Sequence, residues 1–120
     1  MYTFSFEKLE VWKKSRLLAK GIYLITQDFP DSEKFGIVAQ LRRAVISVCS
    51  NIAEGTSRWS SKDQGHFYNI AYSSLMESLN QLILSNDLDY LDADVLSEIR
   101  SDIHVISLML NNLSKTTEID

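Results

Sequence analysis

Apolar residues recur along this chain at steps of three and four, the spacing that places side chains on one face of a helix. One such stripe comprises Ile37, Leu41, Ala44, Val48 and Ile52. The most regular stripe lies nearer the C-terminus and comprises Leu96, Ile99, Ile103, Ile106, Leu110 and Leu113. Its steps alternate between three and four, and this period of about 3.5 residues is typical of helix bundles.

The pattern predicts four helices, over about residues 7–27, 32–57, 61–86 and 92–112. The first must end before Phe29-Pro30, since the residue before proline avoids helical backbone angles. Ser60 and Asp63 have the spacing of a capping box, and Asp92 is a candidate cap for the last helix. The connections are short and no strand signal is present. We therefore predict a single all-α domain over residues 1–120, an antiparallel up-down four-helix bundle with residues 114–120 as a frayed tail.

The second helix has an unusual far side. Ala39, Ile46 and Ala53 lie a heptad apart, on the side that faces away from the core stripe. A surface helix of a monomer should carry charged residues there. We therefore predict that this stripe is buried against another molecule and forms an oligomer interface.

A polar line runs beside the core stripe of the same helix and ends at Arg58. The pattern buries Arg43, and a buried guanidinium needs a partner, for which Glu77 on the third helix is one candidate. Glu54 and Asn51 on the same helix are the others. We interpret the line as a structural network that fixes helix register, made of Gln40, Arg43, Ser47, Asn51, Glu54 and Glu77. The alternative is that Arg43, Asn51, Glu54 and Glu77 contact a ligand directly.

Composition places the chain among globular proteins. Its 120 residues are 45% hydrophobic and 23% charged, which suits one domain with its own core. Cys49 is the single cysteine, so no intramolecular disulfide can form, and the first residues lack the pattern of a secretory leader. We expect a cytoplasmic protein without a membrane-spanning segment.

The net charge of −4 is unevenly distributed. Residues 1–27 hold five Lys or Arg against two Glu, a net of +3, whereas residues 88–120 hold two against seven acidic residues, a net of −5. Either the first and last helices are neighbours whose surfaces attract each other, or the first helix presents a basic binding face. The candidate phosphate-binding residues are Lys13, Lys14, Arg16, Lys20, Arg42, Arg58 and Lys62. Trp59 offers either a stacking surface for a base or an aromatic plug at the end of the bundle.

No set of residues points to catalysis. A di-metal carboxylate site needs Glu-x-x-His motifs on two helices, but only Asp63 and His66 approach that pattern. Cys49 lies among valine and isoleucine residues, where an inert buried thiol is expected. The chain also lacks a glycine-rich phosphate loop. We expect no metal, no cofactor and no enzyme activity.

A set of motifs spans about residues 4–85. It comprises Phe6 to Trp12, Phe29-Pro30 with Glu33, Phe35-Gly36, Gln40 to Ala44, Ser47, Asn51 to Gly55, Arg58, Ser60, Lys62, Phe67, Ala71, Ser74 and Glu77. Together these motifs resemble the bacterial four-helix-bundle family encoded in intervening sequences of 23S ribosomal RNA genes. The most specific part is the Asn-Ile-Ala-Glu-Gly run that follows Arg-Arg-Ala.

The resemblance implies a ring-shaped homopentamer of four-helix protomers. It also implies a distant likeness to the accessory protein of diversity-generating retroelements, which binds nucleic acid and a reverse transcriptase. It does not imply an enzyme. Family members often carry proline at the position of Cys49, so the second helix is expected to be straighter in this chain.

Two functions are consistent with these observations. The first is a non-catalytic oligomeric scaffold that binds RNA or a ribonucleoprotein through basic residues, where a ring multiplies a weak patch into useful avidity. The second is a scaffold for protein–protein interaction without nucleic-acid contact, with the acidic last helix as the partner surface.

Overall fold

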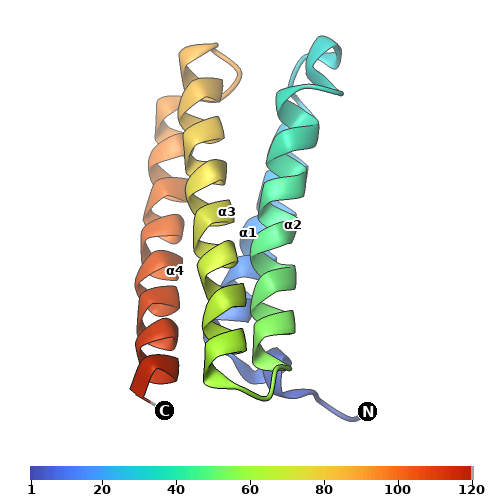
Figure 1. The fold of residues 1–120 in the computed structure, drawn as a ribbon. Coiled ribbons are helices and arrows are strands. Elements are labelled where there is room, and N and C mark those ends of the chain that lie inside the picture. The colour runs from blue at the N-terminus through green and yellow to red at the C-terminus, as the bar shows by residue number, and fades with distance from the viewer. Residues whose placement is uncertain (120) are drawn as a thin grey trace.

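The computed structural model describes the backbone of residues 1–119 and the side chains of residues 1–117. Its four α-helices are α1 (Glu10–Thr26), α2 (Ile37–Thr56), α3 (Ser61–Asp87) and α4 (Ala93–Ile119), and no strand forms within residues 1–119. Consecutive helices run in opposite directions (Figure 1). The all-α prediction is therefore confirmed, and the predicted up-down order fits this arrangement.

Two helices begin later than predicted. A 3₁₀ helix, Ser5–Lys8, precedes α1, and the extended backbone of Leu9 separates the two. A second 3₁₀ helix, Asp31–Glu33, precedes α2, which starts at Ile37 rather than at residue 32. The intervening Gly36 has φ −102° and ψ −118°, outside the helical region. The capping residues near 31–33 therefore begin a short turn and not the helix itself.

The last helix extends further than predicted, because its buried face continues past residue 112. Leu113 packs against the core, and Thr117 is 8% exposed. The Thr117 hydroxyl lies 3.5 Å from the position that a Cβ would take on Gly65 near the start of α3. The prediction of a frayed tail is thus wrong for residues 114–119, while Asp120 lies outside the described residues.

Two turns are held by side chains at the helix ends. Ser60 Oγ accepts a hydrogen bond from the Asp63 amide at 3.1 Å, which confirms the predicted cap of α3. At the opposite end of the bundle, Asp89 adopts φ 63°, a left-handed conformation that aspartate tolerates better than most residues. The neighbouring Tyr90 hydroxyl donates to Glu33 Oε2 at 2.9 Å and ties the α3–α4 turn to the turn before α2.

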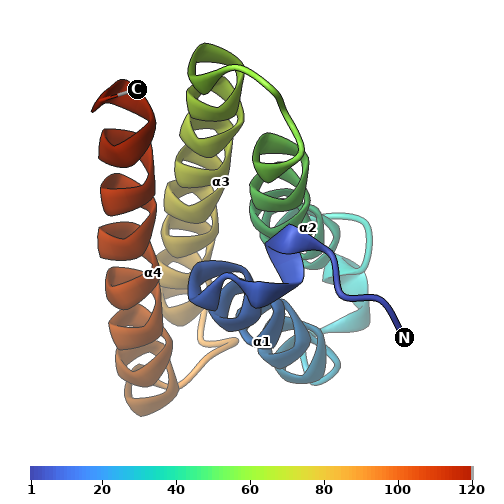
Figure 2. The same cartoon turned by 90° about the horizontal axis from the view of Figure 1, so that it is seen from below.

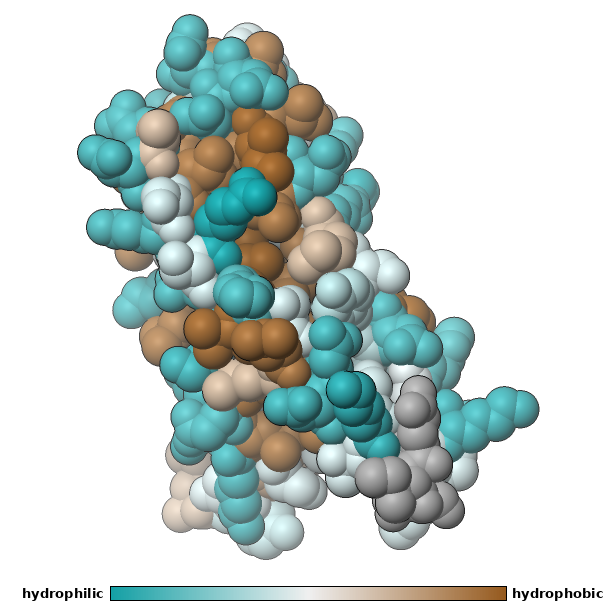
Figure 3. All heavy atoms as spheres, turned by 90° about the vertical axis from the view of Figure 1, so that its left-hand side faces the viewer, coloured by the Kyte–Doolittle hydropathy of each residue, from teal (hydrophilic) through white to brown (hydrophobic). Residues whose placement is uncertain are grey.

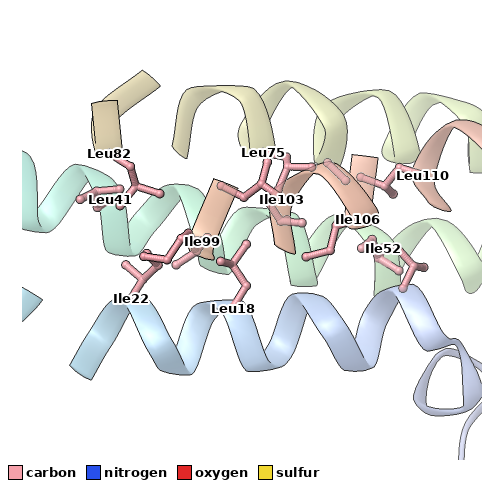
Figure 4. Close-up of a cluster of buried hydrophobic side chains, with 14 of the residues drawn as sticks. Leu18, Ile22, Leu41, Ile52, Leu75, Leu82, Ile99, Ile103, Ile106 and Leu110 are labelled. Atoms are coloured by element: carbon pink, nitrogen blue, oxygen red, sulfur yellow. The ribbon is translucent and has the colours of Figure 1, made fainter. Parts of the chain in front are cut away.

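All four helices contribute to one hydrophobic core (Figure 4). Its best-buried large side chains are Ile22, Leu41, Ile52, Leu75, Leu82, Ile103, Ile106 and Leu110. The helices surround this core in chain order, so that α1 lies between α2 and α4 (Figure 2). Contact is closest between α2 and α3 and least extensive between α1 and α4. The seam between α1 and α4 is therefore the most open of the four.

Two helical glycines test how closely the helices approach. A Cβ on Gly55 would lie 2.8 Å from Tyr68 Cε1 and 2.9 Å from Phe67 Cβ, whereas a Cβ on Gly21 would meet no atom within 4 Å. We expect Gly55→Ala to lower the free energy of unfolding by about 1 to 3 kcal/mol through overpacking. In the monomer, Gly21→Ala should raise the free energy of unfolding by about 0.5 to 1 kcal/mol, because alanine favours a helix over glycine. Urea unfolding of both variants measures the difference, and equal effects would contradict the close approach at Gly55.

Candidate nucleic-acid interface

Three basic side chains share one exposed face of α1. Lys13, Arg16 and Lys20 are spaced by three and four residues, and all three are exposed. Lys13 Nζ lies 3.4 Å from Glu10 Oε1 on the same helix, and the Arg16 guanidinium lies 5.5 Å from the centre of the Trp12 ring. We call Lys13, Arg16 and Lys20 the basic face. Lys14 is separate from it, because it lines a groove between α1 and α4 together with Asp102.

The lysines of α1 are not neutralised by direct contact with α4. Among the described side chains the only ion pair is Lys13 with Glu10, both on α1. Lys14 and Asp102 line the same groove without meeting. The interpretation that the surfaces of α1 and α4 attract each other is therefore not supported by any ion pair in residues 1–117. Within the basic face, Arg16 and Lys20 form no ion pair with any described side chain.

Arg42 holds α1 and α2 together. Its Nε donates to Thr26 Oγ1 at 3.0 Å and its Nη2 donates to the Tyr23 carbonyl at 3.2 Å, both in the last turns of α1. The guanidinium also lies 4.5 Å from the centre of the Tyr23 ring. A positive charge is favourable at this end of a helix. Arg42 thus has a structural role, and its predicted contact with phosphate stays a prediction.

The turn between α2 and α3 carries the remaining candidates. The Trp59 side chain is fully exposed, at 101% relative accessibility, so the interpretation of Trp59 as an aromatic plug is wrong for this protomer. The Arg58 guanidinium lies 4.5 Å from the centre of the Phe67 ring, and Lys62 is exposed in the first turn of α3. We call Arg58, Trp59 and Lys62 the aromatic turn. It lies at the same end of the bundle as the start of α1 (Figure 1).

Part of the polar line of α2 forms hydrogen bonds with side chains of α3. Ser47 Oγ and Ser74 Oγ lie 2.8 Å apart, and Asn51 Nδ2 donates to the Ser47 carbonyl at 2.8 Å and to Ser47 Oγ at 3.0 Å. Further along, Gln81 Nε2 lies 3.4 Å from Gln40 Oε1 and 3.5 Å from Glu77 Oε1. The structure therefore forms the predicted network in two separate parts, Ser47 and Asn51 with Ser74, and Gln40 and Glu77 with Gln81. Ser74 and Gln81 were not predicted as members, although the small serines at steps of four on α3 were a signal of close approach.

The other two members of the polar line lie outside this network. Arg43 and Glu54 are exposed, as is Glu77, and no ion pair joins Arg43 to either carboxylate. The expectation of a buried, paired Arg43 is therefore wrong for the protomer. The physical reason is that α3 covers only the edge of α2 that carries Ser47 and Asn51. Arg43 lies about 40° further round the helix than Ser47 and points into solvent.

The predicted interface stripe of α2 lies outside the core. Ile46 is 45% exposed and Ala39 is exposed. Ala53 is partly buried, because it lines a hollow with Phe4 and Phe6 of the N-terminal segment. The protomer therefore leaves most of this stripe without a covering partner. Whether it forms an oligomer interface stays a prediction.

The structure favours neither nucleophilic chemistry at the Cys49 thiol nor metal binding at His66. Burial raises the pKa of the Cys49 thiol to about 11, so the thiolate that a nucleophile requires is scarce at neutral pH. Within residues 1–117 no three His, Cys, Asp or Glu side chains come close enough to share a metal ion.

None of the helices in the described part of the chain combines the length and the apolar character that crossing a bilayer requires.

Comparison with known proteins identifies relatives. The family model described as 23S rRNA-intervening sequence protein matches residues 7–112. A crystal structure of a protein with unknown function from the S23 ribosomal protein family of Bacteroides thetaiotaomicron VPI-5482 superposes with a TM-score of 0.80. The two chains are 25% identical, and the match covers 88% of this chain and 98% of that one. None of the curated proteins compared with the chain matches it.

The neighbouring residues Arg42 and Arg43 offer a matched pair of substitutions. We expect Arg42→Ala to lower the free energy of unfolding by about 1.5 to 3 kcal/mol, because it removes a charged hydrogen-bond donor and a cation–π contact. In the monomer, Arg43→Ala should change it by less than about 0.5 kcal/mol, as at other exposed positions. Urea unfolding at a protein concentration low enough for the chain to be monomeric checks both. An equally large loss for Arg43→Ala would show that this guanidinium is buried in solution.

Proposed function

This chain belongs to the family of 23S rRNA-intervening sequence proteins, and we propose that it is a non-catalytic scaffold that binds RNA or a ribonucleoprotein. In this proposal the protein assembles into a homo-oligomer, a ring of five copies. RNA contacts the basic face of α1 and the aromatic turn. The proposal assigns the protein no cofactor and no catalytic step.

The observation that carries the proposal is the charge left available on α1. Three basic side chains project from one face of a single helix, and among the described side chains only Lys13 has an acidic partner, in an exposed pair on the same helix. Exposed pairs of this kind contribute little stability and are readily exchanged for other anions. A phosphate backbone is the anion best suited to a row of separated cations, because it presents charges at regular intervals.

The net charge of −4 argues against RNA binding by a single protomer, because RNA is also negatively charged. An oligomer can bind RNA nevertheless, because it combines the basic residues of several protomers. Each protomer can make only a few phosphate contacts, which on their own bind weakly. Several copies held at fixed positions act on one RNA molecule at a high effective concentration, so weak contacts combine into useful affinity. The uncovered Ile46 stripe supports an oligomer, because an exposed apolar stripe on a helix calls for a partner.

The acidic helix supports the second candidate function. Asp94, Glu98 and Asp102 on α4 are exposed and form no ion pair with α1. A basic protein partner could bind this helix while the basic face of α1 stays unoccupied. If the intact oligomer retains no RNA at low salt, the scaffold for protein–protein interaction becomes the better proposal.

Salt dependence and charge neutralisation test the RNA proposal. We expect Lys13→Gln, Arg16→Gln and Lys20→Gln together to weaken RNA binding at least about tenfold across unrelated sequences, because phosphate contacts carry no base specificity. The slope of log affinity against log salt should become shallower, since each phosphate contact with a single strand adds about 0.7 to it. Fluorescence anisotropy over a salt series measures both quantities.

The matched control is the triple variant Lys34→Gln, Arg100→Gln and Lys115→Gln. It changes the net charge of the protein by the same amount but leaves the basic face intact. An equal loss of affinity in this control would show that RNA responds to total charge and would reject the assigned face.

Trp59 provides a separate test of the aromatic turn. We expect Trp59→Ala to weaken binding of single-stranded RNA by about 1 to 3 kcal/mol, the value of one base stacked on an aromatic side chain. Duplex RNA should be unaffected, because its bases are already stacked on each other. Trp59→Phe keeps an aromatic surface and should retain most of the affinity. A loss for duplex equal to that for single strands would contradict stacking at this position.

A further inference from the structure

The seam between α1 and α4 contains an apolar groove that the protomer leaves empty. The hollow measures about 200 Å³, and its floor is formed by Leu18, Ile22, Ile99 and Ile106. Its walls expose large apolar side chains, with Leu17 at 66% and Val105 at 41% relative accessibility. Along the face that carries α4, apolar side chains form a band that hydrophilic side chains cross (Figure 3). Water covers apolar surface here that another helix could cover instead.

Gly21 lines this groove and leaves room for another molecule to approach α1 closely. It lies in the interior of α1 and lines the groove, yet a Cβ at this position would meet no atom within 4 Å. Glycine is a poor helix former, so it weakens the helix without making room for anything in its own chain. An occupant of the groove would use that room, because the missing side chain lets a second backbone or a branched side chain approach α1.

The rims of the groove carry opposite charges. Lys14 stands on the α1 rim and Asp102 on the α4 rim, and neither forms an ion pair among the described side chains. Glu98 is exposed one turn before Asp102 on the same helix. An occupant that complements this surface has an apolar centre, an acidic group near α1 and a basic group near α4.

The outer face of α2 has these features. Ile46, at 45% exposure, stands between Ala39 and Ala53, so one branched side chain projects between two small ones. Arg43 and Glu54 lie on one side of this ridge, Arg43 before and Glu54 after Ile46 along the helix; both are exposed, and neither forms an ion pair among the described side chains. They lie about 16 Å apart along the helix, at about 1.5 Å per residue. A helix that crosses the groove obliquely could therefore place one charge on each rim.

We propose that the α2 ridge of one copy docks in the α1–α4 groove of the next copy. Ile46 lies against Gly21, Arg43 faces the carboxylates of α4, and Glu54 faces Lys14. The inference rests on the proposed function in that it names the contact that builds the oligomer. Ridge and groove are different surfaces on different sides of one chain, so each copy uses both at once. Such a head-to-tail contact closes into a ring, or extends without limit if its rotation does not close.

Two variants each remove one half of this contact. Ile46→Asp places a charge on the ridge at an exposed position and leaves the groove intact. Gly21→Leu fills the groove and leaves the ridge intact; open space at Gly21 and the helix preference of leucine keep the protomer folded. Circular dichroism confirms folding. We expect the parent protein to sediment as an oligomer and each variant alone to sediment as a monomer.

An equimolar mixture of the two variants gives the decisive measurement. The ridge of the Gly21→Leu chain can enter the groove of the Ile46→Asp chain, but neither chain can extend the assembly further. We expect a new species that contains one copy of each variant, with twice the monomer mass in sedimentation velocity. A contact in which the ridges of two copies meet would instead leave Gly21→Leu oligomeric by itself, because that variant keeps its ridge.

Two control variants carry the same kinds of change elsewhere. Leu88→Asp adds a charge at an exposed leucine in the α3–α4 turn, and Asn80→Leu adds a leucine on the exposed side of α3. Both should sediment as the parent does. Retention of the parent oligomer by Ile46→Asp or Gly21→Leu would overturn the inference, as would a mixture that stays monomeric. A parent protein that is monomeric at all concentrations would reject the proposed oligomer as well. Loss of RNA retention by an intact oligomer would reject only the RNA proposal.

Discussion

The close approach of α2 and α3 is the constraint on which the rest of this structure depends. Small residues line the contact on both helices: Gly55 on α2, and Ala71, Ser74 and Ser78 on α3. The buried Ser78 hydroxyl donates to the Ser74 carbonyl at 2.9 Å, so this polar group is satisfied inside the helix contact. With α2 and α3 in close contact, α1 packs mainly on α2 and α4 mainly on α3. This arrangement leaves the seam between α1 and α4 open.

The open seam explains why opposite charges on neighbouring helices do not cancel. Lys14 and Asp102 line the same groove, but they form no ion pair across it. The remaining basic side chains of α1 project from another face of the helix. One helix can therefore serve two surfaces, an apolar groove on the α4 side and a basic face on the outside. In the proposed function, assembly would use the groove and RNA would contact the basic face, so substitutions could alter each separately.

The outer face of α2 has a similar division. Its α3 edge is occupied by the hydrogen bonds of Ser47 and Asn51, and its α1 edge is held by Arg42. Between these edges Ile46 is exposed, and Arg43 and Glu54 form no ion pair among the described side chains. In the proposed oligomer these three side chains contact a second copy of the chain.

The sequence by itself determined the four helices, because apolar spacing and caps such as Ser60 act within a few residues of each other. It also indicated most of the core stripes of α2 and α4, and that Ile46 would lie outside the core. Only the tertiary structure decided that Arg43 is exposed while Ser47 is bonded, that Trp59 is uncovered, and that α1 and α4 leave a groove. A helical wheel gives the direction of a side chain but not the distance to the neighbouring helix. That distance is set by small residues on another part of the chain.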